Sequence, residues 1–492
     1  MNRIACRSRW VFLGVLGTGL IACSAPPSAP ILTLGFGLKE LHFSWISVEK
    51  TDHYRLLADL DGSASFSQIG GNLSASVTST TIPVAVHLFP WETARYVLEA
   101  CNTDGCTRSA EVSPADGMLD TIGYVKASNT GVDDQFGGGS VIYGLSASVS
   151  ADGNTLAVTS IFEDSAAVGI NGDEADNSAL DAGAVYVFSR GENGWVQEAY
   201  VKASNAESSD QFGYSVSLSG DGNTLAVGAN LEASSATGID GDQSDNSALG
   251  TGAVYVFTRD NGWWSQQAYV KASNAEAGDV FGYQVALSFD GNTLAAAAQG
   301  EDSASSGIDF DETNNDAGGS GAVYVFNRNG DEWSQQAYIK ALYPEENDLF
   351  GTSVAISQDG NTLAAGALDE DGGQTGVNGD QADNSERGSG AAYVFTRRGV
   401  SWSQEAYVKG SNTARADAFG AVVALSADGN TLAVGAPDEN NTSTGANAEI
   451  GHRVGFDPRT DFSNGSAYVF ARENGSWAQQ AYIKPSHIGQ FD

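Results

Sequence analysis

The chain has 492 residues, more than one ordinary domain holds and enough for two or three. It contains 60 glycines, and hydrophobic residues make up 41% of it, so it can bury a core while staying rich in turns. Its 24 basic and 61 acidic residues give a formal net charge of −37, which excludes nucleic acid as a ligand because that field repels phosphates. Either a solvated acidic surface or binding of divalent cations accounts for the excess of acid.

The first 30 residues are expected to direct export rather than to fold. Three arginines within residues 1–9 precede an apolar run, Trp10–Ile21, that is too short for a comfortable membrane span. The run continues into Ala22-Cys23, and Leu20 to Cys23 resembles the lipobox of bacterial lipoproteins. That resemblance implies removal of residues 1–22, acylation of Cys23 and a Pro-rich tether over 23–30. Ser24 follows Cys23 where an aspartate would favour retention in the inner membrane, so the outer membrane is expected. The alternative is an ordinary secretory signal in which Cys23 occurs by chance.

Two of the four cysteines remain once Cys6 leaves with the signal and Cys23 is acylated. Cys101 and Cys106 stand at either end of "CNTDGC" in an exported chain, so a disulfide across a hairpin is predicted. Because the loop that it closes is short, this disulfide should stabilise the fold by only about 2 kcal/mol on the chain-entropy estimate. A metal site is not expected there, because no second cysteine pair or nearby histidine completes it.

Residues 31–115 show short runs of alternating polarity separated by turns, such as "LHFSWISV" and "ARYVLEACN". This pattern predicts a β-sandwich. Trp45 on an early strand and Tyr96, five residues before Cys101, resemble the fibronectin type III module. That resemblance implies that Trp45 packs between the two sheets and that the module spaces or binds. Another immunoglobulin-like sandwich is the alternative.

A repeat occupies residues 117–492, with one unit every 69 residues. The hexapeptide DGNTLA begins at Asp152, Asp221, Asp290, Asp359 and Asp428. Phe-Gly pairs, "YVF"-type segments and "W-x-Q-x-A-Y" segments recur with it, as at Phe212, Tyr255 and Trp264 in the second copy. Self-similarity of this kind indicates a supersecondary unit that cannot bury its apolar surface alone.

Each unit is predicted to hold four strands, over 214–219, 224–229, 252–259 and 264–272 in the second copy. The second strand alternates larger residues with Ala226 and Gly228, which would let neighbouring sheets approach closely. Tyr255, Phe257 and Trp264 are expected to fill a wider outer space. This taper predicts wedge-shaped blades of a β-propeller, and no 3.6-residue apolar period supports helices.

The segment "FGYSVSLSGDGNTLAVGA" resembles the FG-GAP repeat of integrin α-subunit propellers. The fold class expected is therefore all-β: a propeller of five four-stranded blades after a fibronectin type III-like sandwich, with one terminal strand helping to close the last blade. Two features depart from the family. A literal Gly-Ala-Pro occurs only at residues 435–437, and the connection of the first two strands is a bare turn, so integrin-type calcium sites do not carry over.

The connections between the second and third strands are long and acidic, and we expect any ligand to bind on their side of the propeller. In the second copy Glu232 and Asp240 lie in this connection with no basic residue, and Glu207 and Asp210 join the same side from the connection between the fourth strand of one unit and the first strand of the next. A submotif of clustered carboxylates and amides suits calcium, although the same residue types also simply make turns. The calcium candidates are Asn171, Asp173, Asp176, Asp240, Asp242, Asp245, Asp309, Asp311, Asn378, Asp380 and Asp383.

Signals for catalysis are poor. The five histidines do not pair at metal-ligand spacing, and neither GxSxG nor HExxH occurs. Adjacent acids such as Glu163-Asp164 and Glu301-Asp302 are expected to be solvated surface, and the repeated tryptophans to be core. No cofactor other than calcium is expected.

The function predicted is non-catalytic: a bacterial outer-membrane lipoprotein that binds protein or glycan partners in adhesion or envelope assembly and contacts the bilayer through Cys23. A polysaccharide-processing enzyme or a structural envelope protein without a dedicated ligand are the alternatives.

Overall fold

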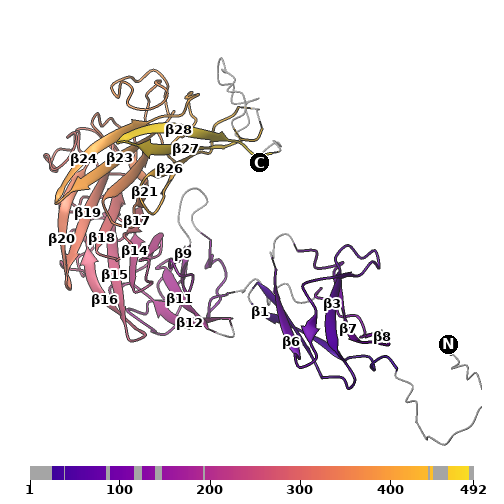
Figure 1. Cartoon of the computed structure of the whole chain (residues 1–492). Helices are drawn as coiled ribbons and strands as arrows, with labels where there is room; N and C mark the ends of the chain where they lie inside the picture. The colour runs from indigo at the N-terminus through magenta and orange to yellow at the C-terminus, as the bar shows by residue number, and fades with distance from the viewer. Residues whose placement is uncertain are drawn as a thin grey trace, which may run out of the picture. The chain divides into compact units, whose positions relative to one another are not determined.

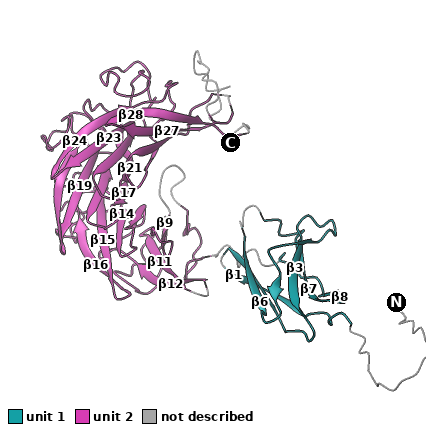
Figure 2. Ribbon diagram, in the orientation of Figure 1, with its two compact units in different colours: residues 1–124 teal, residues 125–492 magenta. Residues whose placement is uncertain are grey.

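The computed structural model describes residues 25–37, 39–84, 89–115, 125–138, 147–191, 194–441, 444–446 and 464–486. The chain divides into two compact units, residues 1–124 and 125–492 (Figure 2). Every regular element within the described ranges is a β-strand. No helix in that part of the chain is long and apolar enough to cross a membrane. The predicted lipobox, Cys23 included, lies outside the described residues.

The first unit has two antiparallel sheets, ordered β1-β2-β6 and β4-β3-β7-β8, with β5 also paired to β3. Trp45 at the end of β2 is buried, with its ring centroid 5.4 Å from that of Tyr54. Tyr96, near the start of β7, is buried against Phe43. Both aromatic residues therefore lie in the core, and for Trp45 this is what the fibronectin type III resemblance implies. The strands are β1 Leu32–Gly37, β2 Glu40–Trp45, β3 His53–Asp59, β4 Ser67–Gln68, β5 Leu73–Ser74, β6 Ser79–Pro83, β7 Arg95–Asn102 and β8 Gly105–Arg108.

The second unit consists of five four-stranded antiparallel sheets that follow one another along the chain (Figure 1). Each sheet is a meander of consecutive strands, which confirms the all-β class and the four-stranded blades. The strands are β9 Ala147–Val149, β10 Thr155–Ser160, β11 Ala184–Gly191, β12 Gly194–Val201; β13 Ser215–Leu218, β14 Thr224–Ala229, β15 Ala253–Asp260, β16 Trp263–Val270; β17 Gln284–Leu287, β18 Thr293–Ala298, β19 Ala322–Asn329, β20 Glu332–Ile339; β21 Phe350–Ile356, β22 Thr362–Ala367, β23 Ala391–Arg398, β24 Ser401–Val408; and β25 Val422–Leu425, β26 Thr431–Ala436, β27 Ser466–Glu473, β28 Ser476–Ile483.

Each sheet packs on the next one along the chain. We call the face turned toward the following sheet the front face and the opposite one the back face. Small residues line the front face: a Cβ added to Gly228 would lie 2.0 Å from the carbonyl oxygen of Gly282 in the following sheet. Tyr255, Phe257 and Trp264 on the back face pack into the core shared with the preceding sheet. Small residues on one face and large aromatic residues on the other thus give each sheet the tapered packing that the sequence predicts.

The DGN turn joins the first two strands of each sheet. The Asp221 carboxylate accepts hydrogen bonds from the Asn223 backbone N–H at 2.9 Å and from the Ser219 hydroxyl at 2.6 Å. Gly222 has a φ of 69°, and a Cβ there would lie 2.7 Å from Thr155 Oγ1 of the preceding sheet. Glycine is required for both reasons, because the turn and the packing each leave no room for a side chain.

The fifth sheet takes all four of its strands from residues 422–483. The prediction that a terminal strand completes the last blade is therefore wrong. Residues 125–129, which resemble the end of a fourth strand, instead place Ala127 in the core of the first sheet beside Tyr186.

Candidate functional site

The candidate site is the set of connections between the second and third strands of the sheets, which we call the long loops. They span residues 161–183, 230–252, 299–321, 368–390 and 437–465. In an antiparallel meander they leave the same end of each sheet as the connections from one sheet to the next. The acidic residues of these loops fall into two groups, one buried and one exposed.

The buried group is centred on a glutamate near the start of each long loop. In the second sheet, Lys271 Nζ donates to Glu232 Oε2 at 2.8 Å and Tyr269 OH donates to Glu232 Oε1 at 2.9 Å. Asn205, which follows the fourth strand of the preceding sheet, donates to the same carboxylate at 3.1 Å. Tyr255 OH in turn donates to Asn205. The cluster therefore ties the loop to its own sheet and to the previous one.

The same ion pair occurs in all five sheets, with both side chains buried each time. This corrects the expectation that Glu163 and Glu301 are solvated surface acids. It also corrects the view of the long loop as acid without a base, because the lysine arrives from the end of the fourth strand. The pairs are Glu163–Lys202, Glu232–Lys271, Glu301–Lys340, Glu370–Lys409 and Glu439–Lys484, at 2.6 to 2.8 Å.

Burial makes these pairs sensitive to the loss of either partner. Desolvation lowers the pKa of Lys271, and the Glu232 carboxylate opposes that effect. Removing one partner of a buried pair leaves an uncompensated charge, which costs about 3–5 kcal/mol. The sequence did contain a signal for the cluster, since the fourth strand of each sheet ends in Tyr-Val or Tyr-Ile and a lysine follows directly. Counting the charges within one long loop does not reveal the ion pair, because the lysine lies outside that loop.

A second set of buried acids lies in the connections between sheets, where an exposed acidic side was expected. Asp210 is buried, and its carboxylate accepts the Glu207 backbone N–H at 3.0 Å. Burial raises its pKa to about 7. Asp279, Asp348 and Asp417 share this burial and this pKa. Because each accepts a backbone N–H three residues earlier, the set shapes the connection.

The first residue of the calcium submotif has a backbone role. Asp240 has a φ of 53°, a left-handed conformation that Asn and Asp adopt more readily than most residues. Its carboxylate accepts the Tyr269 backbone N–H at 2.9 Å, beside the bridge that pairs Ile239 with Val270. Asn171, Asp309 and Asn378 have the same conformation and bind the equivalent tyrosine N–H.

The second and third residues hold the rest of the loop. Asp242 is exposed and accepts the Ser244 backbone N–H at 2.9 Å, as Asp173, Asp311 and Asp380 do with the residue two positions on. Asp245 accepts from the Ser235 hydroxyl at the start of the loop, Asp176 from the Ala166 N–H, and Asp383 from Gln374. Hydrogen bonds from Ser244 lower the pKa of Asp242, and those from Ser235 lower that of Asp245.

In the second, third and fourth sheets an asparagine after the submotif links the long loop to the preceding connection. Asn246 Nδ2 donates to Glu207 at 2.6 Å, and Asn384 does the same to Glu345. The submotif therefore fixes the conformation of the loop and leaves carboxylates such as Asp242 exposed. Among the described residues, the one group of three acid, cysteine or histidine ligand atoms close enough to share a metal ion is Glu99, Cys101 and Cys106. Calcium binding by the long loops stays a prediction.

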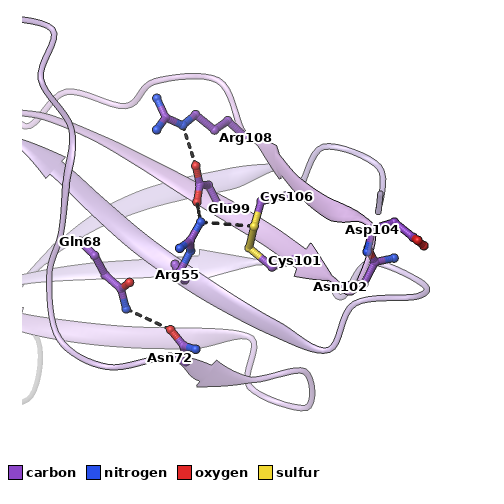
Figure 3. Close-up of a disulfide and its surroundings, with 9 residues drawn as sticks. All are labelled: Arg55, Gln68, Asn72, Glu99, Cys101, Asn102, Asp104, Cys106 and Arg108. Carbon is purple, nitrogen blue, oxygen red and sulfur yellow. Dashed lines mark hydrogen bonds and ion pairs between the residues drawn. A yellow bond between two sulfur atoms is a disulfide. The ribbon is translucent and has the colours of Figure 1, made fainter. Parts of the chain in front are cut away.

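The first unit contains the disulfide. Cys101 and Cys106 are bonded across the β7–β8 hairpin (Figure 3). Arg55 and Arg108 both donate to the neighbouring Glu99 carboxylate, at 2.5 and 2.8 Å. The sulfurs are therefore not free thiolates for a metal, and the surrounding charges are already paired.

Four of the five repeated tryptophans of the fourth strands are core residues, as expected, and the fifth, Trp195, is half-buried. Trp264, Trp333, Trp402 and Trp477 are buried, and an arginine guanidinium lies 5.3 to 5.5 Å from each ring centroid. Arg328 Nη1 and Trp333 Nε1 both donate to Gln267 of the preceding sheet. These rings therefore connect successive sheets and are not available for stacking on a sugar.

Comparison with known proteins identifies the repeat. Three segments, residues 195–257, 264–326 and 333–395, match the model described as FG-GAP repeat. Each runs from the fourth strand of one sheet to the third strand of the next. No curated protein matches the chain.

The chain also resembles several solved structures at low identity. The fibronectin domain of the human collagen α-1(XX) chain is 18% identical over 23% of this chain and all of its own length, with a TM-score of 0.16. The Dos1 propeller is 10% identical over 70% of this chain and 84% of its own, with a TM-score of 0.27. The tricorn protease is 8% identical over 94% and 36%, with a TM-score of 0.34. The segments of the second unit within residues 195–395 are thus similar to FG-GAP repeats.

Proposed function

We propose that the protein is a non-catalytic lipoprotein of the bacterial cell envelope that binds protein or glycan partners through the exposed carboxylates of its long loops. FG-GAP repeats point to a protein-binding or adhesive role. In this proposal the acylated Cys23 inserts into the outer membrane and the fibronectin-like unit spaces the repeats from the bilayer. Adhesion and envelope assembly are both served by such a binding surface.

The observation that supports the proposal is the separation of the loop acids into two groups. Glu232 and its equivalents form buried ion pairs that anchor each loop, so their carboxylates do not reach a partner. Asp242, Asp311 and Asp380 occupy matched positions on successive loops and remain exposed. Loops held in one conformation lose little conformational entropy when they bind, so regularly spaced charges on them are suited to recognition. Complementary partners carry basic groups.

A screen of binding partners tests the proposal. The soluble chain without residues 1–23 is applied to arrays of glycans and of bacterial envelope and host-surface proteins, with calcium and with EDTA. Saturable binding without product release supports the proposal. Turnover of a polysaccharide that one acidic substitution abolishes would instead establish an enzyme, and saturable binding to neither array would contradict a binding role.

Calcium is a separate proposal for the same loops. Clustered carboxylate and amide oxygens such as those of Asp240, Asp242 and Asp245 are ligands that calcium accepts. Titration of EDTA-treated protein measures it directly. A heat of binding together with a rise in melting temperature at millimolar calcium supports the proposal, and the absence of both contradicts it.

A further inference from the structure

Among the described residues, none covers the front face of the fifth sheet as the following sheet covers the front faces of the other four. Ile483 on β28 corresponds to Val201, Val270, Ile339 and Val408, all of which are 0% exposed beneath the following sheet. Ile483 itself is 40% exposed. Ala433, Ala467, Val469 and Ala481 on the same face are half-buried, whereas their equivalents in the first four sheets are buried.

One position makes this face more apolar than its counterparts. In the second and fourth sheets a serine stands there: the hydroxyls of Ser215 and Ser353 donate at 2.8 Å to glycine carbonyls of the following sheet. The fifth sheet has Val422 instead, and Val422 is 56% exposed. A face that met only water would be expected to keep a polar residue here.

Within the described part of the chain, the inner strands of the first sheet are also left without a covering sheet on the back face. Val149 on β9 is 57% exposed, whereas its equivalents Leu218 and Leu287 are buried. Ala147 is exposed and Leu156 is half-buried, although Leu225 at the equivalent position is fully buried. The outer strands of this sheet are covered by residues 125–136.

We propose that the front face of the fifth sheet docks on the back face of the first sheet of a second copy of the chain. The interface already exists four times within each chain, since every front face from the first to the fourth sheet packs on a back face. Among the described strands, no packing of comparable extent joins the first sheet to the fifth sheet of the same chain. A second copy therefore presents the surface that the repeat itself shows to fit.

The contact is head-to-tail, so it generates a closed ring of two or more copies, or an extended filament if the ring does not close. The net charge of −37 on each copy opposes association over long distances. Salt screens that repulsion, and we therefore expect assembly to increase with ionic strength.

Two single substitutions and their mixture test the proposal. The mass of the purified protein in solution is measured by light scattering at low and high salt for the natural chain, Val422→Asp and Val149→Asp. Each variant alone should be monomeric, because each lacks one of the two faces. An equimolar mixture should form a one-to-one dimer, since the intact front face of Val149→Asp meets the intact back face of Val422→Asp. Both positions are exposed in the single chain, so the melting temperatures of the isolated variants should match that of monomeric natural protein.

Three results would overturn the proposal. A natural chain that stays monomeric at high salt excludes the contact. A Val149→Asp variant that assembles like the natural chain indicates that two front faces pair with each other. If the natural chain is monomeric and Val422→Asp melts at a lower temperature than it does, part of the same chain covers the face.

Discussion

Lys271 Nζ lies 2.8 Å from Glu232 Oε2, and the two side chains are 0% and 1% exposed in a chain whose net charge is −37. One lysine per repeat is thus withdrawn from the surface to neutralise one glutamate at the root of each long loop. This pairing decides which acids are structural and which remain for binding.

Loss of one partner of this pair should be strongly destabilising. We expect Lys271→Met to lower the free energy of unfolding by about 3–5 kcal/mol, because Glu232 would remain buried and unpaired. Urea denaturation followed by circular dichroism measures the change. Lys126, which occupies the equivalent place before the first sheet and is exposed, provides the control, and Lys126→Met should change stability by less than about 0.5 kcal/mol. Equal effects of the two substitutions would contradict the structural role.

The buried aspartates of the connections predict an unusual pH dependence. The folded pKa of Asp279 is about 7, above its ordinary value of 3.8, so the folded state binds more protons between these two values. Its contribution to stability is therefore present at low pH and is lost as the pH rises through about 7. The difference in unfolding free energy between the natural chain and Asp279→Asn, measured from pH 4 to pH 8, should move in favour of Asn as the pH rises. A difference that does not vary with pH would refute this.

The close packing of front faces predicts a matched pair of glycine effects. Gly228→Ala places a Cβ 2.0 Å from the Gly282 carbonyl oxygen, so we expect a loss of about 1–3 kcal/mol from overpacking. Gly435, the equivalent in the fifth sheet, has its nearest neighbour at 3.6 Å, and Gly435→Ala should be nearly neutral. Thermal unfolding of both variants decides the point, and similar losses would show that the fifth front face is as tightly covered as the others.

The hairpin disulfide should make a modest contribution. Replacing Cys101 and Cys106 with serine should cost the first unit about 2 kcal/mol, because the loop that the bond closes is short. Denaturation of the oxidised protein and of the double variant measures this. The transition of the second unit should be unaffected, and a shift in that transition would show that the two units unfold together.

The fold was largely predictable because the same local rules recur five times. The strand over 224–229 is found at the predicted residues, and Gly222, Gly228 and Trp264 have the roles that their sizes indicate. A repeated turn and a repeated taper leave few alternatives to a series of four-stranded sheets.

The candidate site was less predictable because its contacts cross long stretches of sequence. Glu232 and Lys271 are 39 residues apart and meet only when the fourth strand has folded beside the long loop. Likewise, the uncovered state of Val422 depends on which sheet follows it, which no local pattern reports. The residue type of Asp240 is compatible with the left-handed turn in which it lies. The same residue types form turns and bind calcium, however, so the sequence alone does not distinguish the two roles.

The most direct test of the account uses a partner identified in the binding screen and measures its affinity for two matched triple variants. Asp242→Asn, Asp311→Asn and Asp380→Asn remove exposed long-loop charges, while each asparagine can still accept its turn hydrogen bond. Asp260→Asn, Glu332→Gln and Glu473→Gln remove the same charge from exposed positions beside the short turns between third and fourth strands. The account predicts that the first variant binds at least about fivefold more weakly than the natural chain and that the second binds unchanged. Equal weakening by both variants, or none by the first, would contradict binding through the long loops.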